Sequence, residues 1–239
     1  MTHNACIVSF FMDNINPKTV ELQQKVVEKY NVSKYPHYRI GTNLSHGQSM
    51  DYFWGLNGVK VDSVASLNIE KKMDFDIIPF LDIDAIPLSE KSIDLYVDRA
   101  ADSKLVGNAQ SSGHINDGKH MFAAPSAVAI HREIFLTIGK PSAIPSTRGD
   151  VGEEYTWAAE KAGIKLDLFM PLRYDEPVIR YDWETNREPF WKLSNGIPYG
   201  QGTTFGSEEL GDLFFHNFQI FQNDNQQKFW ARCEKALNE

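Results

Sequence analysis

The sequence has few cysteines and no long apolar run. Cys6 and Cys233 are the only cysteines among 239 residues, and no Cys/His cluster has the spacing of a zinc site. A disulfide framework is therefore not expected, and a reducing compartment is the simpler interpretation. The apolar run at residues 5–12 is too short for a signal peptide, and no stretch reaches the roughly 18 apolar residues of a membrane-spanning helix. We therefore expect a soluble, cytoplasmic protein without a transmembrane segment.

Positive charge is also scarce. The chain has 24 lysines and arginines against 32 aspartates and glutamates, which gives a formal net charge of −8. General affinity for nucleic acid or for an anionic membrane is not indicated, because both depend on a basic surface. Hydrophobic residues make up 42% of the chain, which is enough for a packed core, and the length suits one large α/β domain or two small ones.

Strand-like and helix-like patterns alternate along the chain, which predicts βαβ units. Asn16-Pro17 is typical of a helix start, and Ser45 with Gln48 three residues later forms a capping-box pattern. Strands are predicted at 6–11, 38–40, 77–81, 105–109, 122–130 and 165–170, and helices after residues 16, 45, 62 (to about 73), 92, 131 and 151, with one more at the C-terminus. The expected fold is α/β, with a mainly parallel central sheet flanked by helices and an irregular C-terminal region.

Two aspartates follow the most clearly apolar of these strands. Residues 77–81 read Ile-Ile-Pro-Phe-Leu and lead directly into Asp82-Ile83-Asp84. Side chains two residues apart in an extended backbone point to the same side, so Asp82 and Asp84 are expected to converge at the carboxyl end of the strand. Open α/β sheets bind ligands at that edge, and adjacent carboxylates favour a cation such as Mg²⁺ or Mn²⁺. The plainer alternative is that one aspartate caps a turn and the other is solvated.

The strand end FLDIDAIPL (80–88) resembles the D-x-D strand end of GT-A glycosyltransferases. Further segments resemble other parts of that family in chain order: SHGQSMDYFWGLN (45–57), FAAPSAVAIHREIF (122–135), DVGEEYTWAAEKAG (150–163) and FFHNF (214–218). The resemblance spans roughly residues 5–220 and depends on the order and spacing of these segments. It implies a single GT-A-like domain, residues 1–239, with a nucleotide-sugar-binding half (1–110) and an acceptor-binding half (111–239).

The resemblance also implies a divalent metal, Mn²⁺ or Mg²⁺, that binds the donor diphosphate. Asp84 would be the more direct ligand, and Asp82 would contact the ribose or a metal-bound water. His216 would be a third ligand through a neutral imidazole. The alternative for His216, which stands in an aromatic stretch, is an ordinary core or interface histidine.

Three acidic residues are candidates for the acceptor chemistry. If transfer inverts the anomeric carbon, a carboxylate must take the proton of the acceptor hydroxyl. Asp150 and Glu153 lie three apart and also form a capping box for the helix predicted from residue 151. The resemblance places the base at the second acidic residue of the pair, here Glu154, where aspartate is more usual in the family. A retaining reaction would need no such base.

The resemblance places the nucleoside against the end of the first strand. Phe10, Phe11 and Asp13 lie there, and either phenylalanine is a candidate for stacking on the base. His46 is a candidate donor contact, because a helix N-terminus attracts anions. Core packing is the alternative role of both phenylalanines.

Two other functions are compatible with these patterns. A nucleotidyltransferase uses a glycine-rich loop with a basic residue after the first strand, whereas residues 12–16 contain neither glycine nor a cation. A non-catalytic carbohydrate- or nucleotide-binding protein of the same fold would need neither turnover nor metal. The leading prediction is a metal-dependent glycosyltransferase that moves a sugar from a nucleotide-diphosphate sugar to an unknown acceptor hydroxyl, with inversion slightly favoured.

Overall fold

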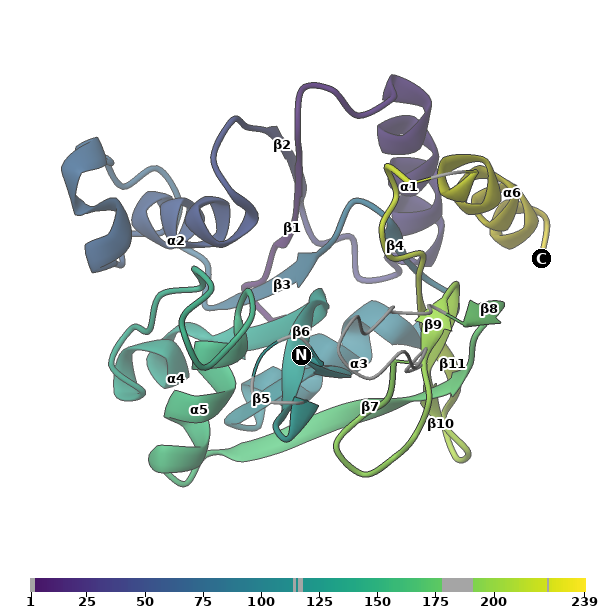
Figure 1. Cartoon of the computed structure of the whole chain (residues 1–239). Coiled ribbons are helices and arrows are strands. Elements are labelled where there is room, and N and C mark those ends of the chain that lie inside the picture. Colours follow the sequence, from purple (N-terminus) through teal and green to yellow (C-terminus); the bar gives the residue numbers. More distant parts are fainter. Residues whose placement is uncertain (1–2, 114, 116–117, 178–190, 223) are drawn as a thin grey trace.

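A nine-stranded sheet forms the centre of the computed structural model, which describes residues 3–113, 115, 118–177, 191–222 and 224–239 (Figure 1). The strand order is β2-β1-β3-β6-β5-β7-β10-β11-β4, and β8 and β9 form a separate pair. The strands are β1 (Ile7–Phe11), β2 (His37–Gly41), β3 (Ile77–Leu81), β4 (Ala85–Pro87), β5 (Lys104–Ser111), β6 (Met121–His131), β7 (Lys165–Arg173), β8 (Glu176–Pro177), β9 (Gly200–Gln201), β10 (Thr203–Ser207) and β11 (Gly211–His216). The helices are α1 (Pro17–Tyr30), α2 (His46–Leu56), the 3₁₀ helix η1 (Asp62–Leu67), α3 (Lys91–Ala101), α4 (Arg132–Thr137), α5 (Glu153–Lys161) and α6 (Asn225–Asn238).

The α/β class with flanking helices is confirmed, and the sheet is mixed where we expected a mainly parallel one. The pairs β1–β2, β1–β3 and β5–β7 are parallel. The pairs β3–β6, β5–β6, β7–β10, β10–β11 and β11–β4 are antiparallel. β6 and β11 each follow the preceding strand through a short connection, and such a connection returns the chain antiparallel, because a parallel neighbour needs a longer crossover.

Local signals set the two helix starts nearest the carboxyl edge of β1. Asn16 caps α1 by accepting a hydrogen bond from the Lys18 N–H at 2.9 Å, with proline at the first helical position. The capping box of α2 is complete: Ser45 accepts from the Gln48 N–H, and the Gln48 side chain accepts from the Ser45 N–H. Both starts agree with the sequence prediction.

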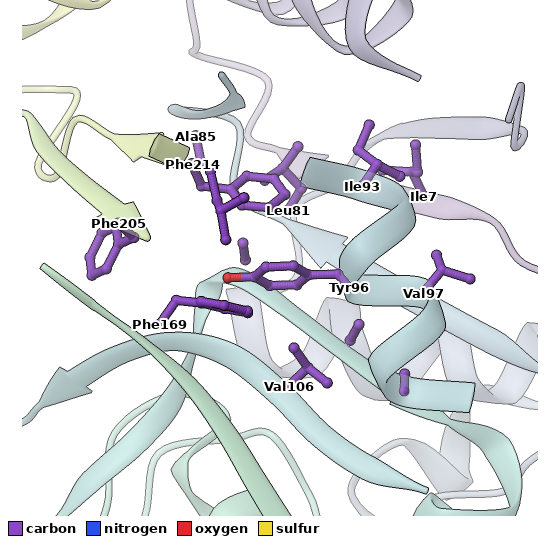
Figure 2. Packing of buried hydrophobic residues seen from close by; sticks show 14 of the residues in the cluster. Ile7, Leu81, Ala85, Ile93, Tyr96, Val97, Val106, Phe169, Phe205 and Phe214 are labelled. Atoms are coloured by element: carbon purple, nitrogen blue, oxygen red, sulfur yellow. The ribbon is translucent and has the colours of Figure 1, made fainter. Parts of the chain in front are cut away.

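Helices cover both faces of the sheet. On one face α3 packs its Tyr96 ring between Phe169 and Phe214, with ring centroids 5.2 and 4.6 Å away, as Figure 2 shows. The Tyr96 hydroxyl donates to Asn108 Oδ1 at 2.7 Å, so the buried polar group is satisfied. On the other face α2, α4 and α5 pack together, with the Trp54 ring stacked on Phe135. Helices α1 and α6 form a third cluster against β4 and β11.

Two predicted helices differ from those observed. The helix expected from residue 62 to about 73 was wrong, because only η1 forms there and Asn68 then takes a left-handed conformation with φ of 44°. Helix α5 begins at Glu153, two residues later than expected, because Gly152 has φ of 74° and stands outside the helix.

The C-terminal region is more regular than expected, since β10 and β11 extend the central sheet. The sequence also suggests a sugar-stacking acceptor wall of four aromatic residues, Trp183, Phe190, Trp191 and Tyr199, with packing of the C-terminal part as the alternative. Trp183 and Phe190 lie outside the described residues. None of the helices in the described part of the chain combines the length and apolarity that crossing a bilayer requires.

Candidate metal centre

The carboxyl end of β3 carries Asp82 and Asp84, and a distant strand brings His216 to them. The turn between β3 and β4 is closed by the Ala85 N–H, which donates to the Asp82 carbonyl at 3.0 Å. β4 pairs antiparallel with β11 so that Ala85 lies opposite His216. The Asn217 N–H donates to the Asp84 carbonyl at 2.9 Å and fixes this register. Residues 132 positions apart in sequence therefore share one edge of the sheet.

The three side chains converge closely. His216 Nε2 lies 3.1 Å from Asp84 Oδ1 and 3.6 Å from Asp82 Oδ2. One ligand atom from each residue can be chosen so that all lie within 4.8 Å of one another. The structure thus brings together the three residues predicted as metal ligands, and their oxygen and imidazole nitrogen donors suit a divalent ion.

Burial makes the charges of this cluster strongly interdependent. Burial raises the pKa of Asp82, although the nearby His46 and His216 oppose the rise. Burial also acts to raise the pKa of Asp84, but the attraction of His216 and the hydrogen bond from it outweigh burial and lower that pKa. The pKa of His216 is raised, because Asp84 and Asp82 outweigh the opposing effect of burial. A carboxylate pair of this kind is stabilised by added positive charge.

One oxygen of the cluster lacks a hydrogen bond. Among the described residues, no donor hydrogen-bonds to Asp82 Oδ1, although this atom is buried. Buried polar atoms in folded proteins are nearly always paired, so an unpaired carboxylate oxygen indicates an ion or solvent that completes the site. The donor set therefore fits a divalent cation.

His46 lies beside the unpaired oxygen, and the other predicted donor contacts lie farther along the same edge. His46 Nε2 is 3.1 Å from Asp82 Oδ1. The Phe10 ring is 6.5 Å from the His46 ring, edge-on, and stacks on Phe80 within the core. Phe11 packs against the cluster between α1 and α6, and Asp13 is exposed in the turn after β1.

A buried glutamine hydrogen-bonds to the backbone of the aspartate pair, and it was not predicted from the sequence. Gln23 of α1 donates through Nε2 to Ser9 Oγ at 2.9 Å and to the Asp82 carbonyl at 3.3 Å. Both Gln23 and Ser9 are fully buried. The position of Gln23 on the apolar stripe of α1, between Leu22 and Val26, was the signal that could have revealed it.

An aromatic wall adjoins the imidazole of His216. The Phe218 ring is 3.9 Å from the His216 ring and packs against Tyr199 and Trp191, at 5.8 and 5.4 Å. The Tyr199 hydroxyl donates to the Ser111 carbonyl at 2.6 Å. The wall thus connects the metal centre to the end of β5.

The chain that follows the metal centre has unusual backbone conformations. Phe218 and Gln219 are consecutive non-glycine residues with φ of 49° and 52°. The Gln201 side chain donates to the carbonyls of Asn217 and Phe218 and stabilises this turn. Left-handed residues of this type cluster at functional sites, where surrounding contacts offset their cost.

The three acidic candidates lie at the start of α5, each with partners. Glu153 is buried: Oε1 is 2.6 Å from His120 Nδ1, and Oε2 accepts from Ser112 Oγ at 3.0 Å and from the Asp150 N–H at 2.8 Å. Asp150 Oδ1 accepts from the adjacent backbone N–H of residue 151 at 2.8 Å. The contact of Glu153 with the Asp150 N–H lies in the turn before α5, whose N-cap is Gly152 and has no side-chain cap. The predicted capping box of Asp150 and Glu153 was therefore wrong, because the helix begins only at Glu153.

Glu154 points to a different partner. It accepts from Arg148 Nε at 2.8 Å and from Ser146 Oγ at 2.9 Å. The hydrogen bond from Arg148 is the main cause that lowers the pKa of Glu154. Glu154 is therefore ionised at neutral pH.

No family model matches the chain, and no curated protein matches it. Among solved structures, the chain is similar to A197 from STIV, with 9% identity, 79% of this chain and 94% of that chain covered, and a TM-score of 0.41. It is also similar to 4-diphosphocytidyl-2C-methyl-D-erythritol synthase from Anaerococcus prevotii, with 11% identity, 70% of this chain and 89% of that chain covered, and a TM-score of 0.40. For the galactosyltransferase LgtC the identity is 13%, the covered shares are 82% of this chain and 73% of that chain, and the TM-score is 0.35. Similarity at this level assigns no family, so the residues of the site carry the functional proposal.

Proposed function

We propose that this protein is a metal-dependent glycosyltransferase that moves a hexosyl or related group from a nucleotide-diphosphate sugar to an acceptor hydroxyl. The observation that carries the proposal is the convergence of Asp82, Asp84 and His216 at the carboxyl edge of β3, with ligand atoms within 4.8 Å. Such an edge is where α/β sheets bind nucleotides. A bound Mn²⁺ or Mg²⁺ would neutralise the charge that gathers on the diphosphate leaving group.

Residues 1–110 form the proposed donor-binding half. Asp82, Asp84 and His216 would hold the metal. Asp84 would be the most direct ligand, and Asp82 would also be placed to contact the ribose or a metal-bound water. Phe10, Phe11 and Asp13 are the proposed nucleoside contacts. His46 stands at the start of α2, where the partial positive charge of a helix N-terminus favours phosphate.

Residues 111–239 form the proposed acceptor-binding half. In an inverting reaction the proton of the acceptor hydroxyl passes to a carboxylate as the hydroxyl oxygen bonds to the sugar carbon. Glu154 is the proposed base, because it is the second acidic residue of the pair at the start of α5, where the resemblance places the base. Glu153 and Asp150 are the alternatives, and both also act in the start of α5.

The metal site is tested by binding experiments with wild type and Asp84→Ala. Thermal stability and hydrolysis are followed over a panel of nucleotide-sugars and free nucleotides, with Mn²⁺ and with chelator. We expect wild type to bind a nucleotide-sugar only with metal, and Asp84→Ala to lose this binding. Full binding by Asp84→Ala would overturn the proposal, and release of pyrophosphate from a nucleoside triphosphate would replace it with nucleotidyl transfer.

The proposed base requires a separate test. Glu154→Gln should keep donor binding and lose transfer, because the amide cannot accept the proton at neutral pH. Glu160→Gln, on the same helix, is the matched control. Normal transfer by Glu154→Gln would exclude Glu154 as the base.

A further inference from the structure

We propose that His46 is a fourth protein ligand of the metal centre, and that the resulting pair of imidazoles makes this centre favour transition ions over Mg²⁺. The inference rests on the proposed function, because it concerns the same metal. His46 is the first residue of α2, and the capping box of Ser45 and Gln48 fixes the start of that helix. Its imidazole therefore reaches the site from an element that contributes none of the other three ligands.

The distance between His46 and Asp82 fits two ligands of one ion. His46 Nε2 lies 3.1 Å from Asp82 Oδ1, and His216 Nε2 lies 3.1 Å from Asp84 Oδ1. Metal–ligand bonds of about 2.1 Å at right angles place neighbouring ligand atoms about 3.0 Å apart. Each aspartate thus has one imidazole nitrogen at the separation expected within a coordination sphere.

The orientation of this contact favours a shared cation over a direct hydrogen bond. Asp82 Oδ1 is buried and accepts no hydrogen bond from the residues that the structure describes, although His46 Nε2 is close to it. The contact of His216 with Asp84, in contrast, is aligned as a hydrogen bond. An ion coordinated by both His46 Nε2 and Asp82 Oδ1 would satisfy both atoms.

The surroundings leave His46 some freedom to close on the ion. The ring is not part of the compact group whose ligand atoms all lie within 4.8 Å, so coordination requires the His46 side chain to move toward Asp84 and His216. The His46 side chain is 35% exposed, which permits that movement. Backbone movement is restricted, because a Cβ on the next residue, Gly47, would lie 2.5 Å from the Ala143 carbonyl oxygen.

The donor set has a consequence for metal choice. Two carboxylates and two imidazoles suit Mn²⁺, Fe²⁺, Co²⁺ or Zn²⁺, whereas Mg²⁺ prefers a shell of oxygens. Loss of the His46 nitrogen should therefore weaken Mn²⁺ binding more than Mg²⁺ binding.

The test uses the full chain after treatment with chelator, with Mn²⁺ as the probe. Pulsed EPR of bound Mn²⁺ counts the coordinated histidine nitrogens, and titration of the free Mn²⁺ signal, with Mg²⁺ as competitor, gives both affinities. The variants are His46→Gln and His216→Gln, and His3→Gln is the matched control because His3 pairs with the distant Asp98. Circular dichroism verifies the folding of each variant.

We expect two nitrogens in wild type and in His3→Gln, and one in His46→Gln. His46→Gln should bind Mn²⁺ at least about tenfold more weakly, as is typical when a metal site loses a supporting group, with a much smaller change for Mg²⁺. A single coordinated nitrogen in wild type would overturn the role of His46, whatever the result for His46→Gln. It would not contradict the proposed metal centre of Asp82, Asp84 and His216. Absence of Mn²⁺ binding by wild type would overturn the proposed function as well.

Discussion

Gln23 shows how strongly single buried residues determine the geometry of the site. Its side-chain amide lies between Ser9 of β1 and the carbonyl of Asp82, and the side chain is fully buried. Replacement by an apolar residue would remove one donor from each of two buried acceptors. The Asp82 carbonyl would keep the Ala85 N–H, and Ser9 Oγ would keep its contact with His37 Nε2. Each lost hydrogen bond is worth about 0.5–1.5 kcal/mol.

We predict that Gln23→Leu lowers the free energy of unfolding by about 1–3 kcal/mol and also weakens Mn²⁺ binding. Urea denaturation and Mn²⁺ titration measure the two effects. Gln24→Leu, one residue along on the partly exposed side of α1, is the control and should change both values little. Wild-type Mn²⁺ affinity in a destabilised Gln23→Leu would show that Gln23 supports the fold without positioning Asp82.

For single residues, the sequence predicted those whose role depends on neighbouring residues in the chain. Asp82 and Asp84 were found from the strand before them, and Asn16 and Ser45 from the helices after them. His216 was included only through a resemblance, because its place opposite Ala85 depends on pairing between distant strands. Gln201 had no local signal, since its partners are carbonyls in a turn that forms only after β11 has packed.

Helix α2 illustrates a constraint that acts through a whole element. The start of the helix packs against the backbone near Ala143, where a Cβ on Gly47 would lie 2.5 Å from the carbonyl oxygen and 2.7 Å from Ile144 Cα. Helix propensity favours alanine over glycine by about 1 kcal/mol, so the close contact and the propensity have opposite effects.

Gly47→Ala should destabilise the protein by about 1–3 kcal/mol despite its better helix propensity, because the backbone must move. Thermal or urea unfolding measures the change. Gly113→Ala adds a Cβ that meets nothing within 4 Å and is the control. If Gly47→Ala were as stable as wild type, the backbone at residues 143–144 would be able to move away from the added Cβ without lowering the free energy of unfolding.

Elements with strong periodicity or clear end signals were predicted well, as β1, β3, α1 and α2 show. The segment after residue 62 was not, because its composition does not distinguish a continuing α-helix from a 3₁₀ turn that stops at a left-handed Asn68. The reversed direction of β6 and β11 was also missed, since strand direction is decided by connections and packing across the sheet.

For the whole molecule, His37 couples stability to pH. Burial, with a smaller contribution from Arg39, lowers the pKa of His37 from the usual 6.5 to about 4. The unfolded chain therefore binds a proton between these values while the folded chain does not. Stability contributed by neutral His37 is present above about pH 6.5 and is lost as the pH falls toward 4.

We predict that wild type loses up to about 3 kcal/mol of unfolding free energy through His37 over this range. Urea denaturation from pH 7.5 to 4.5 measures the loss, and His37→Gln should show a shallower dependence. If the unfolding free energy of wild type and of His37→Gln fell equally with pH, His37 would not be the group that couples stability to pH. His131→Gln, at the half-buried N-cap of α4, controls for removal of a histidine.

The pairing of β4 with β11 sets the order in which the site can be assembled. Asp84 and His216 are separated by 132 residues, so a chain emerging during synthesis presents the two aspartates long before the histidine that joins them. If the proposed function holds, high-affinity capture of a metal would have to wait for the C-terminal strands to dock. A bound ion would then connect segments of the chain that are made early and late, and its removal would destabilise the C-terminal strands first.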